Sequence, residues 1–186
     1  GLVASWPGVI QPGTKSDAIL EYVDVVPTFL DAAGIPQVKE FDGRSFLPLL
    51  HGKTREHKQY AYSIQTTVGV NGVTQPYGIR SVVNHRFRYI LNLFPENEFS
   101  IPVSRNLRSA VTDLGQSERD FANRYLKRPR EELFDISKDP YCERNLAGDP
   151  AFHKEQESLR SALQHWMTSQ HDLGRETELE AGSRHN

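Results

Sequence analysis

The first part of the chain alternates between short apolar runs and turn-forming residues. Residues 2–6 are apolar up to a Pro-Gly pair, a pattern that predicts a short buried strand. A helix is predicted next, because Asp24 can cap it, Pro27 is tolerated in its first turn and Gly34 suits the position after its end. Its apolar stripe comprises Val26, Phe29, Leu30 and Ala33. A wholly apolar strand followed by a helix is typical of the edge of a layered α/β domain whose other strands would lie upstream.

Beyond the first third of the chain, the hydrophobic pattern changes to a period of two. The segments that alternate in this way, and are therefore predicted to be strands, are 60–65, 77–83, 87–93 and 132–136. Asn84-His85 suits the turn of a hairpin between the middle two strands. The segment 105–127 is helical in composition but broken near Gly115, which predicts one interrupted helix or two short ones.

A final helix is predicted after Asp149, which can cap it, with Pro150 at its first position. The residues expected on its apolar face are Phe152, Leu159, Leu163, Trp166 and Met167. The chain is therefore predicted to have an α+β fold, a small antiparallel β-sheet with a packed C-terminal helix, preceded by a strand-helix remnant of an α/β domain.

These patterns divide the chain into three parts. Residues 1–57 are expected to be the end segment of the α/β domain, and residues 58–174 the subdomain that contains the sheet. Residues 175–186 are rich in Glu, Arg, Ser, Gly and His and are expected to form a flexible tail.

Composition and charge exclude several classes of protein. The 186 residues include 22 basic and 24 acidic side chains, a formal net charge of −2, so nothing would neutralise a run of phosphates and no nucleic-acid partner is expected. No stretch approaches the roughly 20 apolar residues of a membrane-spanning helix. Because the only methionine is Met167 and the chain opens on an apolar run, we expect it to be a piece of a longer protein.

The sequence offers no candidate for catalysis or metal binding. The seven histidines are scattered, without the spacing of a metal site. The single cysteine, Cys142, excludes an internal disulfide, and its acidic neighbours disfavour a thiolate. Ser45 lacks the Gly-x-Ser-x-Gly elbow of a nucleophilic serine. No catalytic residue, metal ligand or cofactor is therefore predicted for this chain.

A basic cluster at the predicted hairpin is the most suggestive feature. It comprises Arg80, His85, Arg86 and Arg88, and Tyr77 lies in the loop that enters the same strand. The planar guanidinium fork of Arg matches carboxylates, sulfates and phosphates in a bidentate way, so one interpretation is a wall that contacts an anion. The other is a solvated strand face with Glu partners, which we favour for any single Arg.

Four ordered blocks resemble the sulfatase family. They are residues 6–13 (Trp-Pro-Gly-Val-Ile-x-Pro-Gly), residues 23–35, residues 42–50 (Asp-Gly-Arg-Ser-Phe-Leu-Pro-Leu-Leu) and residues 132–140 together with 145–147. Residues 77–82, 87–88 and 92–93 and the closing His171-Asp172 most resemble the heparan N-sulfatase (N-sulfoglucosamine sulfohydrolase) branch. Ester sulfatases that act on polysaccharides share most of these blocks.

The resemblance implies an alkaline-phosphatase-like α/β domain followed by a small antiparallel C-terminal subdomain. It also implies a formylglycine, made from Cys or Ser in a Cys/Ser-x-Pro-Ser/Ala-x-x-Arg motif, and a calcium ion held by Asp and Asn residues. Cys142 is followed by Glu143-Arg144 and does not match that motif, and no Asp-Asp pair occurs. Calcium and formylglycine are therefore expected in the parent enzyme, upstream of Gly1, and no catalytic or metal residue is assigned to this chain.

The first functional hypothesis is a C-terminal fragment of a sulfatase that hydrolyses sulfate esters or N-sulfate groups of a sulfated saccharide. The fragment would lack the catalytic centre, be inactive alone and supply scaffold and a pocket wall. The resemblance makes Tyr77 and Arg80 candidate substrate contacts and His171 an anchor of the chain end. It implies the missing N-terminal sulfatase domain as partner, and a periplasmic, secreted or lysosomal location. In the isolated chain, self-association or disorder would cover the apolar N-terminal segment.

The alternative hypothesis is a non-enzymatic module that binds an anionic glycan. Arg80, Arg86 and Arg88 would hold the glycan. Saturable binding to the isolated chain would favour this alternative, whereas the sulfatase hypothesis assigns the chemistry to a longer protein.

Overall fold

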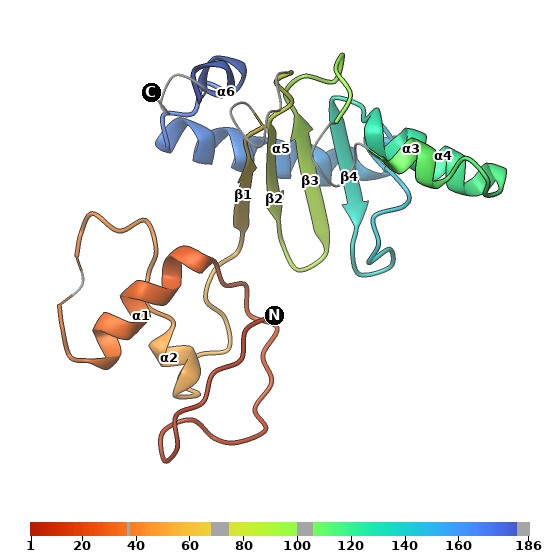
Figure 1. Ribbon diagram of the computed structural model, residues 1–186. Coiled ribbons are helices and arrows are strands. Elements are labelled where there is room, and N and C mark those ends of the chain that lie inside the picture. The colour runs from red at the N-terminus through yellow and green to blue at the C-terminus, as the bar shows by residue number, and fades with distance from the viewer. Residues whose placement is uncertain (37, 68–74, 100–105, 182–186) are drawn as a thin grey trace. The chain divides into compact units, whose positions relative to one another are not determined.

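The computed structural model describes residues 1–36, 38–67, 75–99 and 106–181 (Figure 1). The chain divides into two compact units, Gly1–Ala61 and Tyr62–Asn186. The boundary expected after residue 57 therefore falls inside the first unit. In the described residues, no helix has the length and apolar character needed to cross a membrane.

The helix predicted after Asp24 is confirmed in the first unit. A 3-10 turn, η1 (Tyr22–Asp24), leads into α1 (Val25–Ala32), and a second short helix, α2 (Leu47–Leu50), follows a long coil. The end of α1 is a Schellman motif: Gly34 has φ +71°, and its N–H donates to the carbonyl of Asp31 at 3.0 Å. The N–H of Ile35 donates to the carbonyl of Leu30 at 2.9 Å. Gly34 thus ends the helix as its sequence position predicts.

The buried strand predicted at residues 2–6 is wrong. These residues are exposed coil, and Val3 is 98% exposed. A strand needs a neighbour for its backbone hydrogen bonds, and no described residue pairs with this segment. The predicted apolar stripe of α1 is largely exposed as well: Val26 is 52% and Phe29 70% exposed, while Pro27 and Thr28 are buried.

Asp24 does not act as the predicted cap of α1. Its carboxylate is fully buried and accepts from the backbone N–H groups of Glu21 and Arg44, both at 2.9 Å. Lys58 Nζ lies 2.7 Å from Asp24 Oδ1, and His57 Nε2 lies 3.3 Å from Oδ2. Burial raises the pKa of Asp24, but Lys58 and the two N–H donors outweigh it, so the pKa lies below its ordinary value. Asp24 is therefore a cross-link between the loops of the first unit.

The second unit confirms the α+β fold and all four predicted strands. β1 (Ala61–Gln65), β2 (Ile79–Val83), β3 (Phe87–Asn92) and β4 (Glu131–Asp135) form one sheet in the order β1-β2-β3-β4. β3 is antiparallel to both neighbours, so Tyr89 lies opposite Val82 on one side and Leu133 on the other. Asn84 closes the predicted hairpin, because its Oδ1 accepts from the N–H groups of Arg86 and Phe87.

One face of the sheet is covered by the predicted C-terminal helix, α5 (His153–Ser169), which Figure 1 shows running across the strands. The preceding 3-10 turn η2 (Pro150–Phe152) begins where predicted, with the side chain of Asp149 accepting from the N–H of Ala151 at 2.9 Å. Leu159 and Leu163 are each 1% exposed. Trp166 stacks on Tyr62 of β1, with ring centroids 4.9 Å apart.

The other face of the sheet carries a second apolar cluster. Its buried members are Tyr77, Ile79, Ile90, Phe99 and Phe134. The predicted break in the helical segment is confirmed, because α3 (Leu107–Ala110) and α4 (Gln116–Leu126) are separate short helices. The carbonyl of Leu126, at the end of α4, accepts from the N–H of Phe99 at 2.7 Å, which joins α4 to this cluster.

The prediction of a flexible tail is wrong for Arg175–Glu180, which form a sixth helix, α6. Gly174 precedes the helix with φ +67°, and Glu178 within it is 0% exposed. The polar composition that suggested a tail instead supplies buried ionic contacts to the sheet. Residues 182–186 of the expected tail lie outside the described residues.

Candidate functional site

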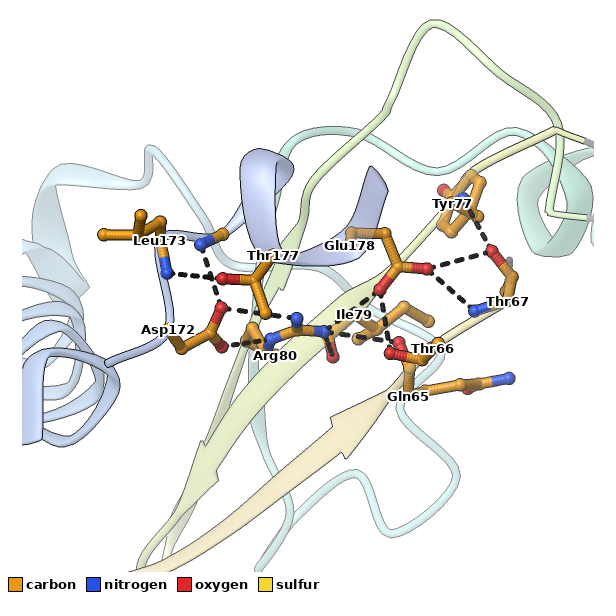
Figure 2. A network of polar contacts seen from close by, with 11 residues as sticks. Gln65, Thr66, Thr67, Tyr77, Ile79, Arg80, Asp172, Leu173, Thr177 and Glu178 are labelled. Carbon is orange, nitrogen blue, oxygen red and sulfur yellow. Dashed lines mark hydrogen bonds and ion pairs between the residues drawn. The ribbon is translucent and has the colours of Figure 1, made fainter. Parts of the chain in front are cut away.

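Arg80, one of the two predicted substrate contacts, lies near the start of β2 in a buried ionic network (Figure 2). Its Nε donates to Asp172 Oδ2 at 2.5 Å and its Nη2 to Asp172 Oδ1 at 3.4 Å. Its Nη1 donates to the carbonyl of Ile79 at 3.1 Å and lies 3.6 Å from Glu178 Oε2. The side chains of Arg80, Asp172 and Glu178 are 1%, 4% and 0% exposed. The guanidinium is therefore held by this chain's own carboxylates.

The second carboxylate of the network, Glu178, links α6 to the end of β1. Its Oε2 accepts from the hydroxyl of Thr66 at 2.9 Å, and its Oε1 accepts from the N–H of Thr67 at 2.8 Å and from the Thr67 hydroxyl at 3.3 Å. Because two carboxylates face one guanidinium, the network has an excess negative charge. These donors, with the N–H of Gly174 at 2.9 Å from Asp172 Oδ1, stabilise that charge away from water.

Tyr77, the other predicted substrate contact, joins the same network through its backbone. Its N–H donates to Thr67 Oγ1 at 2.7 Å, and its ring packs edge-on against Phe99 with centroids 5.2 Å apart. The residue is 1% exposed, and burial raises the pKa of its phenol to about 12, so the hydroxyl stays protonated at neutral pH. The structure thus brings Tyr77 and Arg80 into one network and buries both. Their contact with substrate stays a prediction.

Arg86 and Arg88, two other members of the basic cluster, do not join Arg80. Arg88 lies opposite Val83, an odd number of residues from Arg80, so the two arginines are on opposite faces of the sheet. Arg86 pairs with Asp135 at 2.9 Å and covers the ring of Phe87, 4.6 Å from its centroid. Arg80, Arg86 and Arg88 therefore do not form a single surface that could contact an anion, and that interpretation is wrong. Alternation along the strand separates residues that are close in sequence.

Cys142 has the properties of a structural cysteine. It is half-buried with φ +56°, and burial raises the pKa of its thiol, which opposes the thiolate that a nucleophile or metal ligand needs. Among the described residues, no group of three or more His, Cys, Asp and Glu side chains could hold a metal ion. The described part of the chain does not fit the calcium and formylglycine that the family resemblance implies, so we assign it no catalytic step.

The anchor of the chain end is Asp172 and not His171. His171 is exposed, with φ +54°, whereas the carboxylate of Asp172 binds Arg80. Glu178, Thr66 and Thr67 were missed by the sequence analysis. The acidic residues at 176, 178 and 180, which alternate after Gly174, are the feature that could have indicated Glu178.

The first unit carries an exposed apolar surface. A groove of about 630 Å³ is lined mainly by apolar side chains, among them Leu2, Trp6, Val25, Phe29, Phe46 and Leu50. Nearby on the same unit, Tyr22 is 93% exposed. Exposed apolar surface of this extent is typical of a place where another polypeptide packs.

Comparisons with known proteins give one consistent result. Residues 1–101 match the family model described as N-sulphoglucosamine sulphohydrolase, C-terminal. An ulvan-active sulfatase of Formosa agariphila is 35% identical over 171 residues, which are 92% of this chain and 33% of that protein. Human N-sulphoglucosamine sulphohydrolase is 31% identical over 197 residues, 90% of this chain and 38% of that protein. The chain thus spans about a third of the length of these relatives.

A solved structure supports the fold. A protein in complex with its substrate D-glucosamine-2-N,6-O-disulfate superposes with a TM-score of 0.63, over 90% of this chain and 28% of that one, at 20% identity. The family model covers more than half of the 186 residues, and the matched relatives are sulfatases. The chain therefore belongs to the N-sulphoglucosamine sulphohydrolase C-terminal family of the sulfatases.

Proposed function

We propose that this chain is the C-terminal part of a sulfatase that hydrolyses sulfate esters or N-sulfate groups of a sulfated saccharide. It supplies scaffold and one wall of the substrate pocket, while the formylglycine and the calcium ion belong to the rest of the enzyme. The observation that carries the proposal is the family match over residues 1–101. It is supported by relatives named for activity on ulvan and on N-sulphoglucosamine.

The partner in this proposal is the N-terminal catalytic domain of the same enzyme. The apolar groove on the first unit supports a docking role, because its lining residue Phe29 is 70% exposed and an apolar side chain of that size favours burial. The relatives are about three times as long as this chain, which leaves a domain of suitable size to cover the groove. In the isolated chain, self-association through the same groove stays our expectation.

Sulfate release by the purified 186-residue chain tests the proposal. The substrates are an N-sulfated glucosamine disaccharide and an aryl sulfate, and the matched control is Cys142→Ala. We expect no sulfate above the buffer background from either protein. Release that persists in Cys142→Ala would place a catalytic centre elsewhere in this chain. Release that is lost in Cys142→Ala would identify the cysteine as the nucleophile, and both outcomes would overturn the proposal.

A titration with sulfated oligosaccharide tests the alternative of a glycan-binding module. Arg80 is internal, and Arg86 is already paired with Asp135, so we expect no saturable binding to the isolated chain. Arg88→Ala is the variant of choice because its side chain is exposed. Saturable binding that weakens in Arg88→Ala would favour the alternative.

A further inference from the structure

We propose that helix α6 positions the two described ends of the connection between β1 and β2, with Glu178 as the positioning residue. Thr66 and Thr67 follow β1, and Tyr77 and Gly78 precede β2. Residues 68–74 between these two ends lie outside the described residues. Any consequence for substrate binding rests on the proposed function, in which this chain supplies one wall of the substrate pocket. The structural effect can be measured without any sulfatase activity.

The outgoing end of the connection is fixed by three donors to one carboxylate. Thr66 gives its hydroxyl, and Thr67 gives both its N–H and its hydroxyl, to the oxygens of Glu178. A carboxylate that is 0% exposed is rare, because its desolvation must be offset by bonds of this kind. Figure 2 shows the carboxylate of Glu178 lying between Arg80 and the two threonines.

The returning end of the connection is fixed through Thr67. Its Oγ1 accepts the N–H of Tyr77 at 2.7 Å, so one hydroxyl joins the two ends and itself donates to Glu178. Gly78 has φ +51°, and a Cβ at this position would come within 2.8 Å of the Glu178 side chain. The missing side chain is what allows Glu178 to approach the start of β2.

Helix α6 is attached to the sheet at more than this one residue. The Asp172–Arg80 pair holds the segment before the helix, and Arg175 at its start donates from Nη1 to the carbonyl of Leu93 at 3.0 Å. The guanidinium of Arg175 also lies 4.1 Å from the ring centroid of Phe94. Glu178 is therefore presented to Thr66 and Thr67 from a helix that is independently fixed, as a positioning role requires.

The test measures amide hydrogen exchange of the purified chain. Thr67→Val removes the shared hydroxyl at nearly constant shape, Thr67→Ser restores it, and Glu178→Gln removes the charge. Glu176→Gln is the matched control, because Glu176 is an exposed residue of the same helix. We expect the Tyr77 amide to exchange about tenfold faster in Thr67→Val and Glu178→Gln, as for one lost buried hydrogen bond, and at the original rate in Thr67→Ser and Glu176→Gln.

The amide of Tyr89, in the middle of the sheet, separates positioning from general stability. We expect its exchange to stay unchanged in every variant, since β3 is paired on both sides. Faster exchange at Tyr89 and Tyr77 alike, or no change at Tyr77, would overturn the proposal. If Thr67→Val does not fold, Thr66→Val removes a single bond to Glu178 and is measured in the same way, with the Thr67 amide as the probe. Failure here leaves the sulfate-release test untouched, so the two proposals fail separately.

Discussion

Replacing Arg80 by methionine is the most informative single change, because it separates a structural role from a surface binding role. Methionine keeps an unbranched apolar stem, shorter than that of arginine, and removes the guanidinium. The carboxylates of Asp172 and Glu178 then stay buried without the guanidinium, with side chains that are 4% and 0% exposed. If Arg80 only contacted substrate at the surface, the same change would lower the free energy of unfolding very little.

The expected cost follows from this burial. Removing one partner of a buried ion pair costs about 3–5 kcal/mol, because it leaves an uncompensated charge away from water. That is a large part of the roughly 5–15 kcal/mol by which a domain is stable. Arg88→Met is the matched control: its guanidinium is exposed and lies 3.6 Å from Cys142 Sγ, so we expect a change below about 0.5 kcal/mol.

Urea unfolding followed by tryptophan fluorescence measures these changes. Trp166 stacks on Tyr62 in the second unit, and a Trp6→Phe background removes the signal of the first unit. Adding Asp172→Asn and Glu178→Gln to Arg80→Met is expected to recover part of the loss, because neutral amides cost less to bury than unpaired carboxylates. A loss below about 1 kcal/mol in Arg80→Met, or a loss equal to that of Arg88→Met, would refute the structural role.

Further predictions concern pH and backbone conformation. Burial lowers the pKa of His57 from its ordinary 6.5 more than Asp24 raises it, so the unfolded chain binds a proton more readily. The first unit is therefore expected to lose stability as the pH falls below 6.5, and His57→Gln to reduce that loss; a flat profile between pH 7 and 5 would contradict this. Gly78→Ala is expected to lower Tm by several degrees more than Gly52→Ala. Both have positive φ, but only at Gly78 does a Cβ meet Glu178, at 2.8 Å. Equal shifts would show that the contact is unimportant.

The sequence predicted the elements whose formation depends on nearby residues. The period of two marked all four strands, and Asp149 and Gly34 marked helix ends that form as expected, because turns and caps involve residues a few positions apart. The segment at residues 2–6 was predicted wrongly, because its apolar composition favours a strand only when another strand is available for pairing.

The candidate site could be predicted only in part, because its partners are distant in sequence. The chemistry of Arg singled out Arg80, but nothing local indicated Asp172, which is 92 residues away, as its partner. Glu178 and Thr67 are 111 residues apart, and their contact attaches the polar C-terminal segment to the end of β1. Sequence proximity also grouped Arg80 with Arg88, which strand alternation places on opposite faces.

Determining the coding sequence in frame upstream of Gly1 tests the central claim most directly. We expect a continuous reading frame that encodes a Cys/Ser-x-Pro-x-x-x-Arg motif and an Asp-Asp pair, the residues from which a formylglycine and a calcium site are built. A start codon immediately before Gly1 would contradict it. The chain would then be a separate module, and its binding partners would be the question to pursue.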